Sequence, residues 1–202
     1  MNNFTFQIKV NGKAQTANLQ FASKQELRRY HRSLSSTVPQ CSQAVRDAVE
    51  FTRLAAKRWR YYSGAGEAAE CLSELRQASV QHKHSEVAFI LVATTRRESR
   101  EPPVGLAYCR RTWGHHPALD FPALHPRALD AKQEVAGVGG GSLHGLVRLA
   151  KTLRIRRTWG EATVHSAPFY ERLLALAPIL DLFVIESREM KIIQSRQAKI
   201  SR

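Results

Sequence analysis

A glycine run that leads into an apolar helix decides the fold of this chain. Residues 135–170 read VAGVGGGSLHGLVRLAKTLRIRRTWGEATVHSAPFY. Within the run, Gly137, Gly139, Gly140 and Gly141 leave backbone with few side chains to block a ligand. Ser142, which follows them, is a residue type that caps helices. Apolar residues then recur at helical spacing, at Leu143, Leu146, Val147, Ala150 and Leu153. Free N–H groups and the positive end of the helix dipole at such a helix start favour phosphate.

The second half of the stretch predicts a strand and another helix. Residues 157–164 include Trp159, Thr163 and Val164, which favour a strand. Ser166 and Pro168 are typical of a helix start, and the Phe169-Tyr170 pair follows them.

This order of parts resembles the GNAT superfamily of acetyl-CoA-dependent N-acyltransferases. The family signature is R/Q-x-x-G-x-G, an apolar helix, a strand, and a helix with a Phe-Tyr pair. Gly137-Val138-Gly139 matches G-x-G, and Phe169-Tyr170 matches the aromatic pair. Residues 119–126, LDFPALHP, look like the family's central strand. Glu134 stands at the R/Q position, and the likeness covers about residues 85–187.

The resemblance implies an α+β fold built on a mixed, mostly antiparallel central sheet. This sheet is splayed at the cofactor cleft and flanked by helices, with an N-terminal β-hairpin and helices. We expect a single domain over residues 1–202. Residues 1–84 would form the hairpin and helical part on the acceptor side, and residues 85–194 the acyl-CoA-binding core.

The same resemblance assigns the cofactor-binding residues. Backbone amides from Val138 through Gly139, Gly140 and Gly141 to Ser142 would hold the pyrophosphate of acetyl-CoA. The strand edge at Ala123 and Leu124 would pair with pantetheine and polarise the thioester carbonyl. Thr163 stands where the family often has an asparagine beside the cofactor.

The catalytic roles are also implied by position in the motif. Tyr170 would protonate the departing thiolate as general acid, although an aromatic on a helix facing a sheet is also a common core residue. Asp120 and Glu161 are the carboxylates best placed to act as general base. No metal site is expected, because the adjacent His115 and His116 lack a carboxylate cluster.

The implied function is an acetyl-CoA-dependent N-acetyltransferase, in which an unidentified amine attacks the thioester directly in a ternary complex. Other interpretations of the glycine run remain open. Gly137, Gly139 and Ser142 nearly meet the dinucleotide fingerprint, but the preceding decapeptide is polar. A Walker loop fails because Leu146 follows Gly145, and a plain structural turn is the remaining alternative.

The charge of the chain suggests a second partner. Its 31 Lys and Arg residues against 17 Asp and Glu residues give a formal net charge of +14. Such a surface attracts RNA or another polyanion. One alternative is therefore a non-catalytic basic module that binds nucleic acid, and another is a toxin-like acetyltransferase acting on aminoacyl-tRNA. A third interpretation is that the charge serves only solubility.

Cysteine usage and hydropathy indicate a cytoplasmic protein. Cys41, Cys71 and Cys109 are odd in number and far apart, which suggests reduced thiols. The longest apolar run, residues 87–93, is too short for a membrane span. No secretory signal is visible, and the oligomeric state stays open, a dimer included.

The remaining elements follow from local patterns. A hairpin is predicted over residues 4–10 and 13–21, around Asn11-Gly12. Helices are expected from Ser23, over residues 43–62, and over residues 67–78. Aromatic residues of the second helix would line an acceptor pocket or pack in the core. Strands are expected over 87–95, 104–113 and 179–186, with residues 190–194 as a partner strand before a frayed basic tail.

Overall fold

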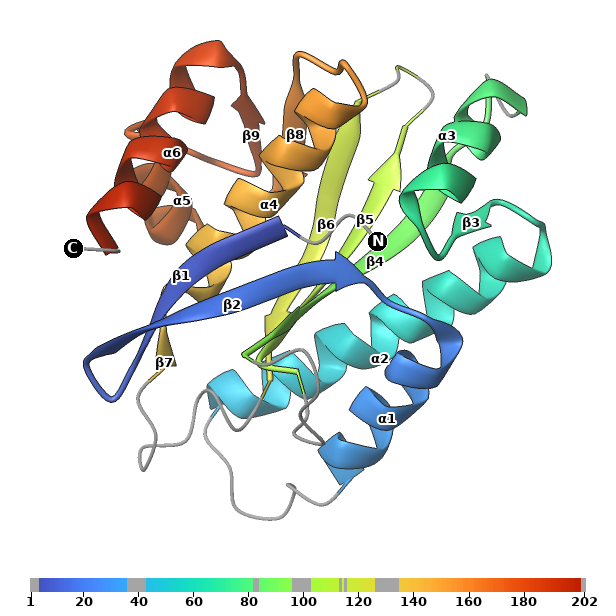
Figure 1. Ribbon diagram of the computed structural model, residues 1–202, viewed down its shortest axis with the longest axis horizontal. Coiled ribbons are helices and arrows are strands. Elements are labelled where there is room, and N and C mark those ends of the chain that lie inside the picture. Colours follow the sequence, from blue (N-terminus) through green and yellow to red (C-terminus); the bar gives the residue numbers. More distant parts are fainter. Residues whose placement is uncertain are drawn as a thin grey trace.

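A computed structural model describes residues 4–35, 43–81, 84–95, 103–112, 114, 116–125 and 135–200. Its centre is one sheet with the strand order β7-β1-β2-β4-β5-β6-β8-β9, and β3 pairs with β4 outside this path (Figure 1). The strands are β1 (Phe4–Val10), β2 (Lys13–Phe21), β3 (Ala68–Ala69), β4 (Val87–Thr94), β5 (Gly105–Arg111), β6 (Pro117–Leu124), β7 (Val135–Ala136), β8 (Thr158–Glu161) and β9 (Leu182–Ile185).

The sheet is mixed and mostly antiparallel, as the sequence predicts. Among the described strands, only the β3–β4 and β6–β8 pairs are parallel. The β4–β5–β6 meander forms an antiparallel centre, and β8 joins it only after helix α4 (Val138–Thr152) has crossed the sheet. The predicted α+β fold class is therefore confirmed.

Helices cover both faces of this sheet (Figure 1). On one face lie α1 (Lys24–Ser35) and α2 (Gln43–Gly64), and they pack on Ala88, Ile90 and Val92 of β4. The alternate β4 residues face the other core, which also contains residues of α3 (Leu72–Gln81), α4, α5 (Ala167–Leu174) and α6 (Ser187–Ile200). Residues 87–93 of β4 are all buried, because helices cover this strand on both faces of the sheet.

The N-terminal hairpin is part of the central sheet. Asn11 and Gly12 both have positive φ, 51° and 76°, which is the geometry of a tight two-residue hairpin turn. Strand β2 then pairs with β4, so the hairpin extends the sheet, and β1 packs against α4. The predicted capping box of α1 is also present, because Ser23 and Glu26 each accept the other's backbone N–H.

Two elements differ from the sequence prediction. The expected helix over residues 67–78 begins only at Leu72, because Ala68 and Ala69 pair in parallel with β4. The expected strand over residues 190–194 and the frayed tail from Ser195 are instead helix α6. Its buried residues Met190, Ile193 and Gln197 recur at helical spacing and pack toward α4 and β1.

Candidate active site

Helix α4 begins inside the glycine run. Gly137 is its N-cap residue, with φ of 93°, a left-handed conformation that favours glycine. The first helical hydrogen bond runs from Gly141 N–H to the Gly137 carbonyl at 2.8 Å. The amides of Val138, Gly139 and Gly140 lie ahead of this bond and have no partner within the helix. This is the donor arrangement that suits an anion.

The capping role that the sequence suggests for Ser142 is wrong. Ser142 lies after the first turn of α4, and its side chain is buried. Gly137 takes the cap position because only a left-handed residue lets the chain leave β7 and enter the helix directly.

Part of the glycine run serves packing against the hairpin. A Cβ atom on Gly141 would overlap the Phe6 ring, and one on Gly145 would overlap Leu19. These two glycines let α4 lie close against β1 and β2. Gly139 and Gly140 face α5 instead, where a Cβ would lie 3.0 Å from the Phe169 ring and 3.5 Å from Leu173. Gly141 is therefore taken up by packing, whereas Gly137, Gly139 and Gly140 line the cavity described below.

The sheet opens between β6 and β8. These strands pair only at Ala118 with Trp159 and at Leu119 with Gly160. Strand β6 continues to Leu124 and stays paired with β5 on its other side. Among the described residues its edge beyond Leu119 has no strand partner on the β8 side, so its backbone groups there can bind an extended ligand.

A cavity of about 290 Å³ lies where this open edge meets the starts of α4 and α5. It brings together most of the residues that the sequence assigns to the cofactor and the proton donor. Its lining includes Ala123, Leu124, Val138, Gly139, Gly140, Ser142 and Tyr170. Gly137, Ser166 and Phe169 also line it. Segments far apart in the chain thus form one site.

Tyr170 is held firmly at the edge of this cavity. Its ring stacks on Phe183 with centroids 4.1 Å apart and meets Phe169 edge-on at 5.1 Å. Burial raises the pKa of Tyr170, and Cys109 adds to the rise. The phenol is therefore protonated at neutral pH, as a proton donor must be.

Asp120 is not brought to the cavity. It is the extra residue of a β-bulge in β6, since Phe121 pairs with Tyr108 and Leu119 with Cys109. A bulge redirects a side chain. Here Asp120 lies on the α2 side of the sheet.

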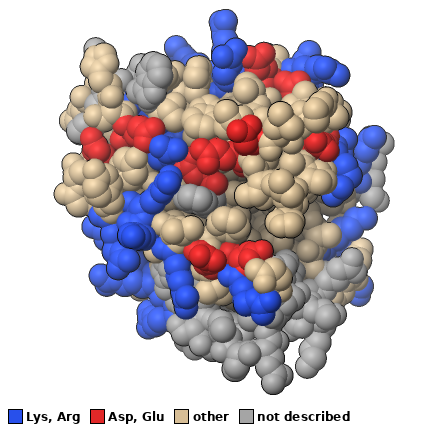
Figure 2. All heavy atoms as spheres, turned by 180° about the vertical axis from the view of Figure 1, so that it is seen from behind, with Lys and Arg blue, Asp and Glu red and all other residues tan. Residues whose placement is uncertain are grey.

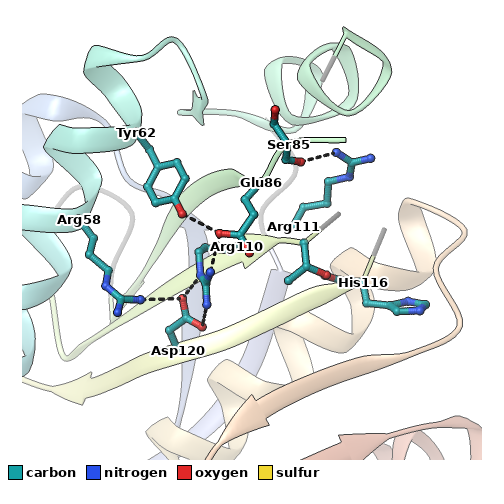
Figure 3. Close-up of polar contacts among 9 residues, drawn as sticks. Arg58, Tyr62, Ser85, Glu86, Arg110, Arg111, His116 and Asp120 are labelled. Carbon is teal, nitrogen blue, oxygen red and sulfur yellow. Dashed lines mark hydrogen bonds and ion pairs between the residues drawn. The ribbon is translucent and has the colours of Figure 1, made fainter. Parts of the chain in front are cut away.

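Arginines hold the Asp120 carboxylate there (Figure 3). Arg110 donates to both carboxylate oxygens, and Arg58 of α2 lies 3.9 Å away. Arg110 also pairs with Glu86, which accepts a 2.6 Å hydrogen bond from Tyr62. Burial alone would raise the pKa of Glu86, but the hydrogen bonds from Tyr62 and Arg110 outweigh it and lower that pKa.

Three other predicted site residues also lie outside the cavity lining. Glu161 is exposed at the end of β8, where it pairs with Leu182 of β9. Thr163 is exposed, and its hydroxyl accepts the Ser166 N–H at 3.2 Å while Ser166 Oγ accepts the Thr163 N–H. Thr163 therefore forms the turn that starts α5. Gly141 packs on Phe6, as described above.

Sequence reasoning missed the partners of Asp120. Arg110 and Glu86 fix its position, and the available signal was a pair of arginines in the otherwise apolar β5. The aromatic residues of α2 lie apart from the cavity lining: Trp59 is buried, Tyr61 is exposed, and Tyr62 binds Glu86. Glu134, His115 and Cys41 lie outside the described residues.

No group of three or more His, Cys, Asp or Glu residues in the described part of the chain is placed to hold a metal ion. None of the described helices combines the length and the apolar character needed to cross a membrane.

No protein-family model matches the sequence, and no curated protein matches it. Several solved structures are similar. A variant spermidine N-acetyltransferase from Vibrio cholerae is 13% identical over 89% of this chain and 98% of that chain, with a TM-score of 0.44. A GNAT-family acetyltransferase from Staphylococcus aureus Mu50 is 12% identical over 84% and 98%, with a TM-score of 0.42. An acetyltransferase from Trypanosoma brucei is 15% identical over 81% and 94%, with a TM-score of 0.41.

Proposed function

We propose that this chain is an N-acetyltransferase that takes the acetyl group from acetyl-CoA and transfers it to an amine. The observation that carries the proposal is the cavity at the fork between β6 and β8. It places unpaired amides of α4, an unpaired strand edge and a buried tyrosine around one space. Each of these three features suits one part of an acyl-CoA thioester.

The start of α4 would bind the diphosphate of acetyl-CoA. The amides of Val138, Gly139 and Gly140 are free of helical partners, and the helix dipole adds positive potential. The pantetheine arm would then extend along the open edge of β6 at Ala123 and Leu124 and pair with the backbone as an added strand. A backbone N–H on this edge would polarise the thioester carbonyl.

Tyr170 would supply the proton that the leaving group needs. In the proposed reaction the amine nitrogen forms a bond to the thioester carbon, and the carbon–sulfur bond breaks. The thiolate of CoA takes the phenolic proton of Tyr170, and a proton from the amine restores the phenol through water. The raised pKa of Tyr170 keeps its proton in place before transfer.

The proposed mechanism needs no carboxylate base in the cavity. Among the described residues that line it, none is an acid or a histidine. Asp120 is engaged by two arginines, and Glu161 lies apart on β8. We therefore assign the removal of the amine proton to water and expect an acceptor that enters partly deprotonated.

Incubation with acetyl-CoA and a panel of amines tests this proposal. The panel holds polyamines, amino acids, peptides with free N-termini and aminoacyl-tRNA. We expect acetyl-CoA to raise the melting temperature and at least one amine to release free CoA thiol. Neither stabilisation nor thiol release at millimolar acetyl-CoA would refute the proposal.

A further inference from the structure

A second, larger concave site lies between α1 and α2, on the other side of the sheet from the fork cavity. This groove has a volume of about 870 Å³, within the roughly 300–1,000 Å³ of ligand sites. Its apolar lining residues are Leu27, Ala56 and Trp59. Every charged residue that lines it in the described chain is a cation, namely Lys24, Arg28, Arg32, Arg53 and Arg60.

Most of these cations have no acidic partner among the described residues. In that part of the chain only Lys24 of this group forms an ion pair, with Glu70 at 3.9 Å, and its side chain remains 66% exposed. Arg28, Arg53 and Arg60 form no ion pair with any described residue. Like charges placed this close on two helices repel each other, so the cluster does not stabilise the fold. An anion in the groove would relieve this repulsion.

The spacing of the cations indicates an extended anion. From Lys24 to Arg32 the helix rises about 12 Å, and from Arg53 to Arg60 about 10 Å. Along the axis of a B-form duplex the charges of one strand recur about every 3.4 Å, so each row is long enough to face about three or four successive phosphates. Two rows of cations of this length match the phosphates of a nucleic-acid strand better than they match a single compact phosphate group.

An exposed aromatic side chain adds a feature typical of nucleic-acid sites. Tyr61 follows Arg60 in α2 and lies outside the groove lining; it is 74% exposed, with its ring set edge-on to Tyr62. A nucleobase can stack on such a ring while arginines bind the adjoining phosphates. In Figure 2, seen from behind, Lys and Arg side chains gather toward the lower left, which corresponds to the lower right of Figure 1, where α1 lies.

We propose that the groove between α1 and α2 binds the phosphodiester backbone of a nucleic-acid strand. The groove and the fork cavity share no lining residue. Binding there does not depend on acetyl-CoA, and it can be measured whether or not the chain transfers an acetyl group.

The test measures fluorescence anisotropy of labelled 20-mers with the full chain in the absence of acetyl-CoA. Single-stranded RNA, single-stranded DNA of the same sequence and a duplex are each titrated at several salt concentrations. The groove variant replaces three cations that have no ion pair: Arg28→Ala, Arg53→Ala and Arg60→Ala. The control variant removes the same charge from exposed positions of α6: Arg188→Ala, Lys191→Ala and Arg196→Ala.

We expect the groove variant to bind single strands at least about tenfold more weakly at low salt. The slope of log K against log salt should become shallower by about 2, since each phosphate contact on a single strand contributes about 0.7. The α6 variant should stay within about twofold of the natural chain. Thermal unfolding checks that both variants are folded. We expect them to be, because all the replaced side chains lie at the surface.

Three results would overturn the proposal. The first is absence of binding to all three nucleic acids at low salt. The second is equal weakening by the groove and α6 variants, which would indicate only general charge attraction. The third is tighter binding of anionic phospholipid vesicles than of any nucleic acid, with the same dependence on the groove arginines. A preference for RNA or for DNA supports the proposal and identifies the strand.

Discussion

The substitution Gly140→Asp is expected to weaken ligand binding at the start of α4 without destabilising the helix. Gly140 is the third residue of the helix, and a Cβ there would meet Leu173 at 3.5 Å, an ordinary contact. An acid in the first turn stabilises a helix by about 0.3–1 kcal/mol. Gly140→Asp should therefore fold at least as well as the natural chain.

The same carboxylate would repel a bound diphosphate. Two phosphate charges about 6 Å from it, at an effective dielectric constant of about 40, each cost about 1.4 kcal/mol. The sum of about 3 kcal/mol corresponds to roughly 100-fold weaker binding. Gly140→Ala is the matched control, since it adds the same Cβ without charge and should change affinity less than about threefold.

Calorimetric titration with CoA, together with thermal unfolding of all three proteins, measures both effects. We expect the affinity loss in Gly140→Asp to shrink as salt rises, because the repulsion is screened. If Gly140→Asp and Gly140→Ala fold normally and bind CoA equally well, the diphosphate does not lie at the start of α4. The assignment of the α4 amides to the diphosphate would then be wrong.

Three further predictions concern packing, pH and catalysis. Gly141→Ala should destabilise the chain by about 1–3 kcal/mol, because its Cβ would overlap Phe6, whereas Gly64→Ala, with open space around it, should not; urea unfolding measures both. Because the folded pKa of Glu86 lies below its unfolded value, this carboxylate contributes stability above about pH 4.5 that is lost as pH falls through the folded pKa. Glu86→Gln should flatten that part of the stability-against-pH curve, and an unchanged curve would contradict the assignment. Tyr170→Phe should lower turnover by about 10²- to 10⁴-fold with CoA affinity kept; an unchanged kcat would exclude the phenol as proton donor.

Local patterns were sufficient to predict most of the elements. Asn11-Gly12 fixed the hairpin, the Ser23–Glu26 spacing fixed the start of α1, and the apolar stripe after Ser142 indicated α4. These signals depend on residues close together in the chain, so no tertiary contact can overrule them easily. The mixed sheet was implied by the family resemblance.

Contacts between distant residues were not visible in the sequence. Ala68 and Ala69 became a strand because β4 offered a free edge to them, against their helical pattern. Part of the glycine run is needed for packing, because a Cβ on Gly141 would overlap Phe6, which lies more than a hundred residues earlier in the chain.

The bulge at Asp120 shows the same limit for a residue that was predicted to lie in the site. Strand alternation cannot reveal an extra residue in β6, so the pattern gave no warning that this carboxylate would lie among arginines on the α2 side. By contrast, the α4 and α5 residues of the cavity lining are close together in the sequence. The cavity brings Val138, Gly139, Gly140 and Tyr170 together, and their roles toward acetyl-CoA stay a proposal.

A crystal structure of the chain with CoA would locate the diphosphate and the sulfur. We expect diphosphate oxygens about 2.7–3.2 Å from the amide nitrogens of Val138, Gly139 and Gly140. We also expect the CoA sulfur between β6 and β8, within reach of the Tyr170 hydroxyl. CoA bound with its diphosphate away from α4, or with its sulfur outside the fork, would rule out the proposed site.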